Sequence, residues 1–244
     1  VATNPTVSPA IVTVSRGGVE VKQFGLEPNA IETVVLPWVP ELAQFDLVGD
    51  QQTYQSLLLE GGAYHVASSV PITVYQFNPL EFQRPDCNND PVACFSYTND
   101  ASLLLPTTAL GREHVVVTRP SMHLAIKDPM QATPTWLGGP GFVAVTATSN
   151  GTTVKVTASC HIRAGAGVTA MTPGQELSFA LDAGDVLLLE SDAPPPGNNN
   201  VIGKPCETVD FNDAELTHCP GEQAYDLTGT RISSTSVVSV IAGH

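Results

Sequence analysis

The chain has 244 residues, of which 42% are hydrophobic and 14% are charged, so it has enough apolar material for a packed core and too little charge for a disordered tail. Its 24 acidic residues outnumber its 10 basic ones and give a formal net charge of −14, which repels phosphate backbones and excludes nucleic acid as an expected partner. No run approaches the roughly 20 consecutive apolar residues that span a bilayer, so we expect no direct membrane insertion.

Strand-forming runs recur along the whole chain. Gly and Pro each occur 20 times, and these residues interrupt every window in which helical apolar spacing could develop. Short β-branched runs instead alternate along the sequence and are bounded by turn residues, as strands are. They lie at 11–14, 19–21, 72–75, 114–117, 142–145, 153–156 and 237–240. The chain is therefore predicted to be all-β.

Turn chemistry joins some of these runs. The segment Ser15-Arg16-Gly17-Gly18 separates the first two runs, and Ser149-Asn150-Gly151-Thr152 separates two later ones. The second segment carries the Asn-Gly pair, which is favoured in tight two-residue turns with positive φ. Each segment therefore predicts a β-hairpin.

The two halves of the chain contain similar segments. Residues 19–21 align with 154–156, and residues 66–74 align with 232–240, where a strand, a Ser-rich turn and another strand follow one another. Such self-similarity indicates repeated structural units. We predict two related antiparallel β-sandwich units, 1–135 with connecting strands and 136–244, with one large continuous β-sandwich as the alternative.

The five cysteines form two close pairs and one single residue. Cys87 and Cys94 lie in a turn-rich segment, and Cys206 and Cys219 bracket a polar loop. We predict that a disulfide closes each of these two short loops, which implies an oxidising compartment. Cys160 is left over in a strand-like run, where a buried free thiol is expected and pairing with a cysteine outside this sequence is the alternative.

Two tryptophans are the candidate ligand-binding residues. Trp38 and Trp136 both lie in Pro-rich breaks, where a large exposed ring can anchor a partner. The alternative interpretation is that each ring caps one end of the core.

Two loops gather the oxygen ligands that calcium prefers. Their candidate ligands are Asp86, Asn88 and Asp90 in the first loop and Asp210, Asn212 and Asp213 in the second. Neither loop has the Gly and terminal Glu of an EF-hand loop, and Asn and Asp are common turn residues in any case. Turn formation is the preferred interpretation, calcium binding is the alternative, and no other cofactor is expected.

Sequence motifs of catalysis are missing. The chain has no Gly-x-Ser-x-Gly segment, and its glycine-rich stretches at 138–141 and 165–167 lack the Lys-Ser/Thr of a phosphate-binding loop. Its six histidines include no His-x-x-x-His pair that could hold a metal on a helix. We therefore expect no enzymatic activity, with a site assembled from distant loops as the alternative.

Several segments resemble the IgGFc-binding protein N-terminal domain family. They are residues 62–79, residues 99–106, Asp226-Leu227-Thr228-Gly229-Thr230-Arg231-Ile232 and the closing Gly243-His244, in the family's order. The resemblance implies a secreted or surface-exposed β domain of the bacterial type, and it brings neither catalytic residues nor an antibody-contact motif. Similar domains continue past the Gly-His pair into a further cysteine-containing segment, so a fragment of a longer protein is expected.

The combined prediction is an extracellular or cell-surface recognition or adhesion module, secreted or attached to a cell. Its loops, carried on a rigid β scaffold, would bind a protein or glycan ligand on a cell surface or in matrix. The alternative is a structural building block of a surface layer, stalk or filament, which would associate with copies of itself.

Overall fold

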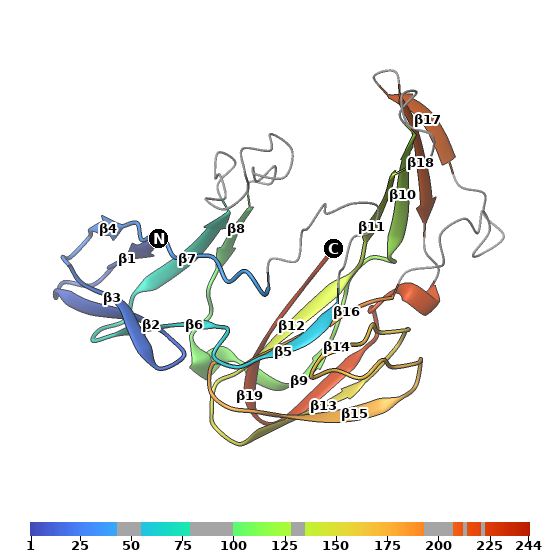
Figure 1. Ribbon diagram of the computed structural model, residues 1–244. Helices are drawn as coiled ribbons and strands as arrows, with labels where there is room; N and C mark the ends of the chain where they lie inside the picture. Colours follow the sequence, from blue (N-terminus) through green and yellow to red (C-terminus); the bar gives the residue numbers. More distant parts are fainter. Residues whose placement is uncertain (43–54, 79–99, 128–134, 193–206, 212–213, 221–222) are drawn as a thin grey trace. The chain divides into compact units, whose positions relative to one another are not determined.

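A computed structural model describes residues 1–42, 55–78, 100–127, 135–192, 207–211, 214–220 and 223–244 (Figure 1). Strands dominate these ranges, which contain no α-helix and two short 3-10 helices. All strand pairs are antiparallel in the described part of the chain, except one short parallel pair, β5 with β14. The prediction of an all-β, antiparallel chain is confirmed.

The chain forms two compact units. Unit 1 contains Val1–Ala43 and Gly61–Leu110, and unit 2 contains Gln44–Glu60 and Gly111–His244. The predicted division of the sequence at 135/136 and the internal duplication stay predictions.

Unit 1 consists of a four-stranded sheet with the order β4-β1-β7-β8 and a three-stranded sheet with the order β3-β2-β6. Its elements are β1 (Ala2–Thr3), β2 (Ala10–Arg16), β3 (Val19–Leu26), β4 (Ile31–Glu32), β6 (Tyr64–Ser68), β7 (Thr73–Asn78), β8 (Asp100–Leu103) and the 3-10 helix η1 (Thr107–Ala109). Buried side chains from both sheets form one apolar cluster around Ala2, Val12 and Leu26. Ala10, Val12 and Val14 alternate along β2 and are buried, as side chains on one face of a strand are.

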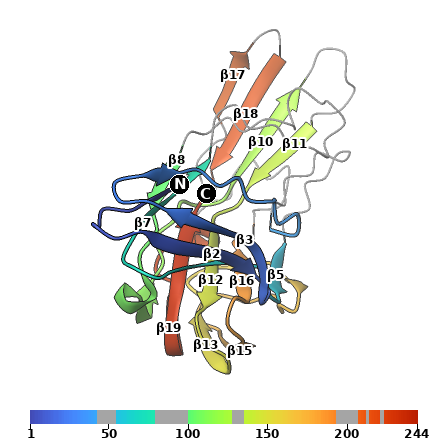
Figure 2. The same cartoon turned by 90° about the vertical axis from the view of Figure 1, so that its left-hand side faces the viewer.

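The hairpin predicted at residues 15–18 is confirmed. Strands β2 and β3 pair along their whole length, from Ala10 opposite Leu26 to Arg16 opposite Val19, and Figure 2 shows the two strands side by side. Gly17 and Gly18 both have positive φ, 55° and 77°, which residues without a β-carbon adopt at no steric cost. The Gly-Gly pair therefore sets the turn, as tight hairpin turns require.

Unit 2 contains a curled eight-stranded sheet and a separate four-stranded sheet with the order β11-β10-β18-β17. Its elements are β5 (Ser56–Leu59), β9 (Gly111–Val115), β10 (Met122–Lys127), β11 (Thr135–Gly139), β12 (Phe142–Ala147), β13 (Thr152–Thr157), β14 (Gly165–Ala166), β15 (Glu176–Leu181), β16 (Val186–Glu190), β17 (Glu207–Phe211), β18 (Ala214–Pro220), the 3-10 helix η2 (Gln223–Tyr225) and β19 (Arg231–Gly243). The core lies inside the curled sheet, where alternate residues of β12, β13 and β15 are buried.

The long strand β19 organises the curled sheet. Its C-terminal half pairs with β12, as Val240 does with Val145. Its N-terminal half pairs with β13, as Ile232 does with Val156, while β9 occupies the other edge of this half. One continuous strand therefore connects two groups of strands, and in Figure 1 it runs beside β12.

The hairpin predicted at residues 149–152 is wrong. Strands β12 and β13 do not pair with each other; both run antiparallel to β19, along different halves of it. The Asn-Gly turn instead contacts the turn between β15 and β16, where Gly151 N–H donates to Asp182 Oδ1 at 2.8 Å and Ala183 N–H donates to Asn150 Oδ1 at 3.0 Å. A turn motif predicts a local reversal, but pairing with the distant β19 determines which strands are neighbours.

Candidate binding site

The tryptophans singled out from the sequence lie in different units. Trp38 belongs to the extended segment that follows β4 in unit 1, and 40% of its surface is exposed. Trp136 lies on β11 of unit 2, opposite Ala125 of β10. Each tryptophan is therefore considered separately, and their role in binding stays a prediction.

Most of the predicted calcium ligands lie outside the described residues. This holds for Asp86, Asn88, Asp90, Asn212 and Asp213. Asp210 lies on β17, opposite Glu215 of β18, and so belongs to a strand of the β17–β18 pair. No group of three or more His, Cys, Asp or Glu side chains is placed to hold a metal ion within the described ranges. Calcium binding stays a prediction.

The predicted disulfides also stay predictions, because Cys87, Cys94 and Cys206 lie outside the described residues. Cys219 lies on β18. The register of β17 and β18 places Glu207, which follows Cys206 in the sequence, directly opposite His218, which precedes Cys219.

Two titratable groups are buried in unit 2. Cys160 is a fully buried free thiol, as expected, and burial raises its pKa to about 12. The Glu190 carboxyl is 4% exposed, its Oε2 has no hydrogen-bond partner among the described residues, and burial raises its pKa to about 7, against a smaller opposing effect of Arg163. Because both groups are closed to solvent, neither offers a surface site.

The segment 226–232, which carries the family resemblance, stabilises unit 2. Asp226 Oδ1 accepts hydrogen bonds from Thr118 Oγ1 at 2.9 Å and from the Thr228 N–H at 2.8 Å. The buried Thr230 hydroxyl shares a 2.8 Å hydrogen bond with Ser159 Oγ and also accepts one from the Ser159 N–H. These bonds connect the turn segment that precedes β19 to two neighbouring segments. The motif therefore maintains the scaffold.

Two further features of the resemblance are also structural. Leu227 and Ile232 of the same segment are fully buried in the core. Gly243 lies opposite Phe142, and a β-carbon at this position would be 2.7 Å from the Phe142 ring. A larger residue at 243 would therefore require the ring to move. Leu227, Ile232 and Gly243 therefore contribute to the fold.

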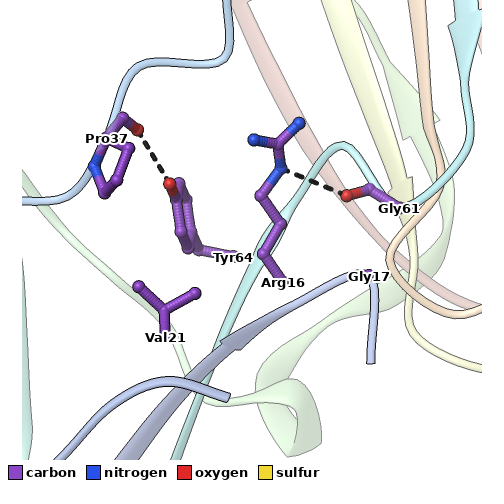
Figure 3. Close-up of a pocket in the computed structure, with 6 residues that line it drawn as sticks. All are labelled: Arg16, Gly17, Val21, Pro37, Gly61 and Tyr64. Atoms are coloured by element: carbon purple, nitrogen blue, oxygen red, sulfur yellow. Dashed lines mark hydrogen bonds between the residues drawn. The ribbon is translucent and has the colours of Figure 1, made fainter. Parts of the chain in front are cut away.

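An open surface pocket lies in unit 1 at the tip of the β2–β3 hairpin (Figure 3). It has a volume of about 380 Å³ and is lined by Arg16, Gly17, Val21, Pro37, Gly61 and Tyr64. Arg16 and Tyr64 are directly opposite each other on β2 and β6. Pro37 comes from the extended segment after β4, so three separate parts of unit 1 form the pocket.

Two glycines allow the pocket to form. Gly61 has a φ of 56°, and a β-carbon built on it would lie 2.8 Å from the Gly17 Cα. The hairpin tip and the turn before β6 can therefore approach this closely because Gly61 lacks a side chain. A β-carbon at Gly17 would lie an ordinary 3.8 Å from the Gly61 carbonyl oxygen, and glycine is favoured there by its φ of 55° instead. This approach places the Gly61 carbonyl beside the Arg16 side chain.

The polar groups of the pocket are held by internal contacts. Arg16 Nε–H donates to the Gly61 carbonyl at 3.3 Å, and the guanidinium carbon lies 5.8 Å from the centre of the Tyr64 ring. The Tyr64 hydroxyl donates to the Pro37 carbonyl at 2.8 Å. Figure 3 shows Tyr64 between Arg16 and Pro37. The guanidinium is thus oriented before any ligand arrives, which lowers the entropy cost of binding.

A second surface feature of unit 1 is an apolar face of the four-stranded sheet. Tyr75 and Phe77 alternate on β7 with their ring centres 6.3 Å apart, and Leu103 lies opposite Tyr75 on β8. Half of the Phe77 and Leu103 surfaces is exposed, and Ile31 of β4 is 69% exposed. Contiguous exposed apolar surface of this kind often marks an interaction site.

Sequence reasoning missed the pocket. Arg16 was assigned only to a turn, and Tyr64 only to the segment that resembles the family. The available signal was a cation next to a Gly-Gly turn in a chain with few cations. Its pairing with Tyr64, 48 positions later, depends on the sheet register and could not be read from local spacing.

A family model described as IgGFc binding protein matches residues 100–244. This range extends from β8 to the end of β19 and includes residues 226–232 and the closing Gly243-His244, whereas residues 62–79 lie outside it. No curated protein and no solved structure matches the chain. No helix among the described residues is long and apolar enough to cross a membrane.

Proposed function

The chain belongs to the IgGFc-binding protein family, and on this basis we propose that it is an extracellular module that binds a protein ligand through exposed surface on its β scaffold. The family match over more than half of the chain is the observation that carries this proposal. The module would be secreted or displayed on a cell surface, where it would act in recognition or adhesion.

The distribution of buried and exposed residues supports this function. Within unit 2, Leu227 and Ile232 of the family resemblance are packed in the core, and Asp226 and Thr230 are hydrogen-bonded to neighbouring segments. Contacts with a ligand would therefore involve other residues, on loops and exposed faces. In unit 1 the Arg16 pocket and the apolar face around Phe77 provide such surface.

We propose binding without catalysis. The buried carboxyl of Glu190 has the raised pKa that a catalytic acid often shows. A substrate could not reach it, however, because only 4% of the residue is exposed. Burial raises the pKa against a smaller opposing effect of Arg163, and this cause requires no catalytic role.

Self-association is a second candidate function. Strand β3 has one partner, β2, among the described residues, and its Val19 and Val21 side chains are exposed. The backbone groups of an unpaired strand edge can pair with a strand from a second chain. This arrangement would suit a building block of a surface layer, stalk or filament.

Surface plasmon resonance with the immobilised full chain tests the main proposal. The analytes are the Fc fragment of immunoglobulin G, a panel of purified extracellular protein domains and a glycan array. Saturable binding of at least one protein, competed by the soluble chain, is expected. Binding confined to glycans would contradict the protein assignment, and no binding together with ordered oligomers in sedimentation would favour the building block.

A further inference from the structure

We infer that the pocket at the β2–β3 hairpin tip binds a single carboxylate from an acidic side chain of a partner protein, an inference that rests on the proposed protein-binding function. Arg16 is half-buried at the edge of this pocket. Its Nε–H donates to the Gly61 carbonyl, and its two Nη groups make no hydrogen bond or ion pair within the described part of the chain. The groups that form a two-point contact with a carboxylate are therefore available.

The shape of the pocket defines the approach. The Tyr64 ring lies beside the guanidinium, and its hydroxyl is bonded to the Pro37 carbonyl. These contacts fix the orientation of both side chains, and the missing side chain of Gly61 lets the turn before β6 lie close to Gly17 at the hairpin tip. A ligand meets a preoriented cation beside an aromatic ring, with Val21 and Pro37 as further apolar walls (Figure 3).

The charge of the site favours a monoanion. Arg16 is the single cationic residue among the six that line the pocket, and the whole chain carries a formal charge of −14. A phosphate dianion would be only half compensated by one guanidinium and would experience the negative field of the chain more strongly. A carboxylate matches the guanidinium in charge and in its planar, two-oxygen geometry.

The walls favour an amino-acid side chain over a sugar acid. Pro37 and Val21 present apolar surface, the Tyr64 hydroxyl already donates to a carbonyl, and the Gly61 carbonyl already accepts from Arg16. A sugar acid would place several hydroxyl groups against this surface with few partners, which costs free energy. The methylene groups of a glutamate or aspartate side chain form no hydrogen bonds and would therefore lose none against this surface.

Nuclear magnetic resonance titration of the full chain tests the inference without a protein partner. The probe is acetyl-Gly-Glu-Gly-amide, whose only charge is its carboxylate, and the matched control is acetyl-Gly-Gln-Gly-amide. For a ligand of this size in an open site we expect a Kd on the order of 1 mM. The shifts should be saturable and should centre on the amides of Gly17 and Gly61 and the Arg16 Nε–H.

Three variants distinguish carboxylate binding in the pocket from a general effect of the net charge of the chain. Arg16→Gln should weaken binding at least about tenfold, since a hydrogen bond to a charged group contributes about that factor. Arg16→Lys keeps the charge but loses the planar fork, so it should bind with intermediate strength. Lys22→Gln removes a cation from β3 of the same sheet, outside the pocket, and should bind like the parent chain. Unchanged melting temperatures verify that all three fold.

Each outcome decides the inference. Equal binding of the glutamine peptide, or equal binding by Arg16→Gln, would overturn the carboxylate site. Binding of methyl glucuronide in place of the glutamate peptide would overturn the assignment to a protein side chain. If no probe binds while a protein ligand is still captured on the sensor surface, the pocket inference fails and the proposed function stands.

Discussion

The Glu190 carboxyl gives unit 2 a dependence of stability on pH that can be calculated from the structure. Burial raises its pKa from 4.5 to about 7. A group with a raised pKa in the folded state stabilises that state fully below its unfolded pKa, and this contribution is lost as the pH rises through the folded pKa. The difference of about 2.5 pKa units corresponds to roughly 3 kcal/mol, lost between about pH 4.5 and pH 7. Above that range the folded chain carries a buried, ionised carboxylate.

Replacing Glu190 with Gln removes this titration. We expect the Gln variant to gain stability relative to the parent chain as the pH rises from 4.5 to 8, by up to about 3 kcal/mol. Any constant cost of the new amide shifts the whole curve and leaves its slope unchanged. The comparison is also insensitive to the other acidic residues, because they titrate in both chains.

Urea unfolding monitored by circular dichroism at several pH values measures this difference. Glu113→Gln is the matched control, since Glu113 is an exposed carboxylate on β9 of the same sheet; its curve should follow that of the parent chain. A difference between the Glu190→Gln variant and the parent that stays constant between pH 4.5 and pH 8 would refute the reasoning.

Three further predictions test packing. Gly61→Ala should destabilise unit 1 by about 1–3 kcal/mol in thermal unfolding, because the positive φ of Gly61 and its 2.8 Å approach to Gly17 both oppose a β-carbon. Gly18→Ala is the control: Gly18 also has positive φ but has open space around it, so this substitution should cost less stability. Thr230→Val should cost about 1–3 kcal/mol in urea unfolding, because it leaves the Ser159 N–H without its acceptor and removes one of the two hydrogen bonds of the Ser159 hydroxyl. A loss below about 0.3 kcal/mol would contradict this role. Cys160 should resist alkylation in the native chain at pH 8 and react in urea, as peptide mass spectrometry can show; rapid native labelling would mean that its surroundings open.

The strands could be predicted because their signal is local. Alternation along 142–145 and 153–156 identifies β12 and β13 and their buried faces, since side chains in a strand alternate between faces whatever its partner. Which strands pair with one another, in contrast, is not decided by local sequence. Asn150-Gly151 has hairpin chemistry, yet β12 and β13 both pair with β19, more than eighty positions away. Burial against distant strands outweighs the preference of one turn.

The candidate site could be predicted only in part. Trp38 was named as a candidate ligand-binding residue from its Pro-rich segment, and the structure shows that 40% of its surface is exposed, while its role in binding stays a prediction. The pocket depends on contacts between residues that are 45 to 48 positions apart, Arg16 with Gly61 and Tyr64. No pattern within the hairpin indicates which segment will cover the guanidinium. Register, which the sequence does not reveal, brings these residues together.

The acidity of the chain restricts which carboxylates the pocket can select. At about 0.1 M salt, charges influence one another over roughly 10 Å, so the field of a chain with a net charge of −14 acts on the residues next to a bound carboxylate. A carboxylate with acidic neighbours is repelled, whereas one with neutral or basic neighbours is not. Arg16 attracts a carboxylate locally, while the net negative charge of the chain repels further acidic groups nearby. The pocket should therefore prefer an acidic residue that has no acidic neighbours in its own sequence.

This reasoning predicts an order of affinity among three peptides. Acetyl-Lys-Gly-Glu-Gly-Lys-amide should bind more tightly than acetyl-Gly-Glu-Gly-amide, and acetyl-Glu-Gly-Glu-Gly-Glu-amide should bind less tightly per carboxylate at low salt. The three affinities should converge near 1 M salt, where the screening length falls to about 3 Å. In the Arg16→Gln chain the basic peptide should lose its saturable shifts at Gly61. Retention of those shifts would mean that the lysines bind to acidic surface elsewhere, and the selectivity argument would then fail.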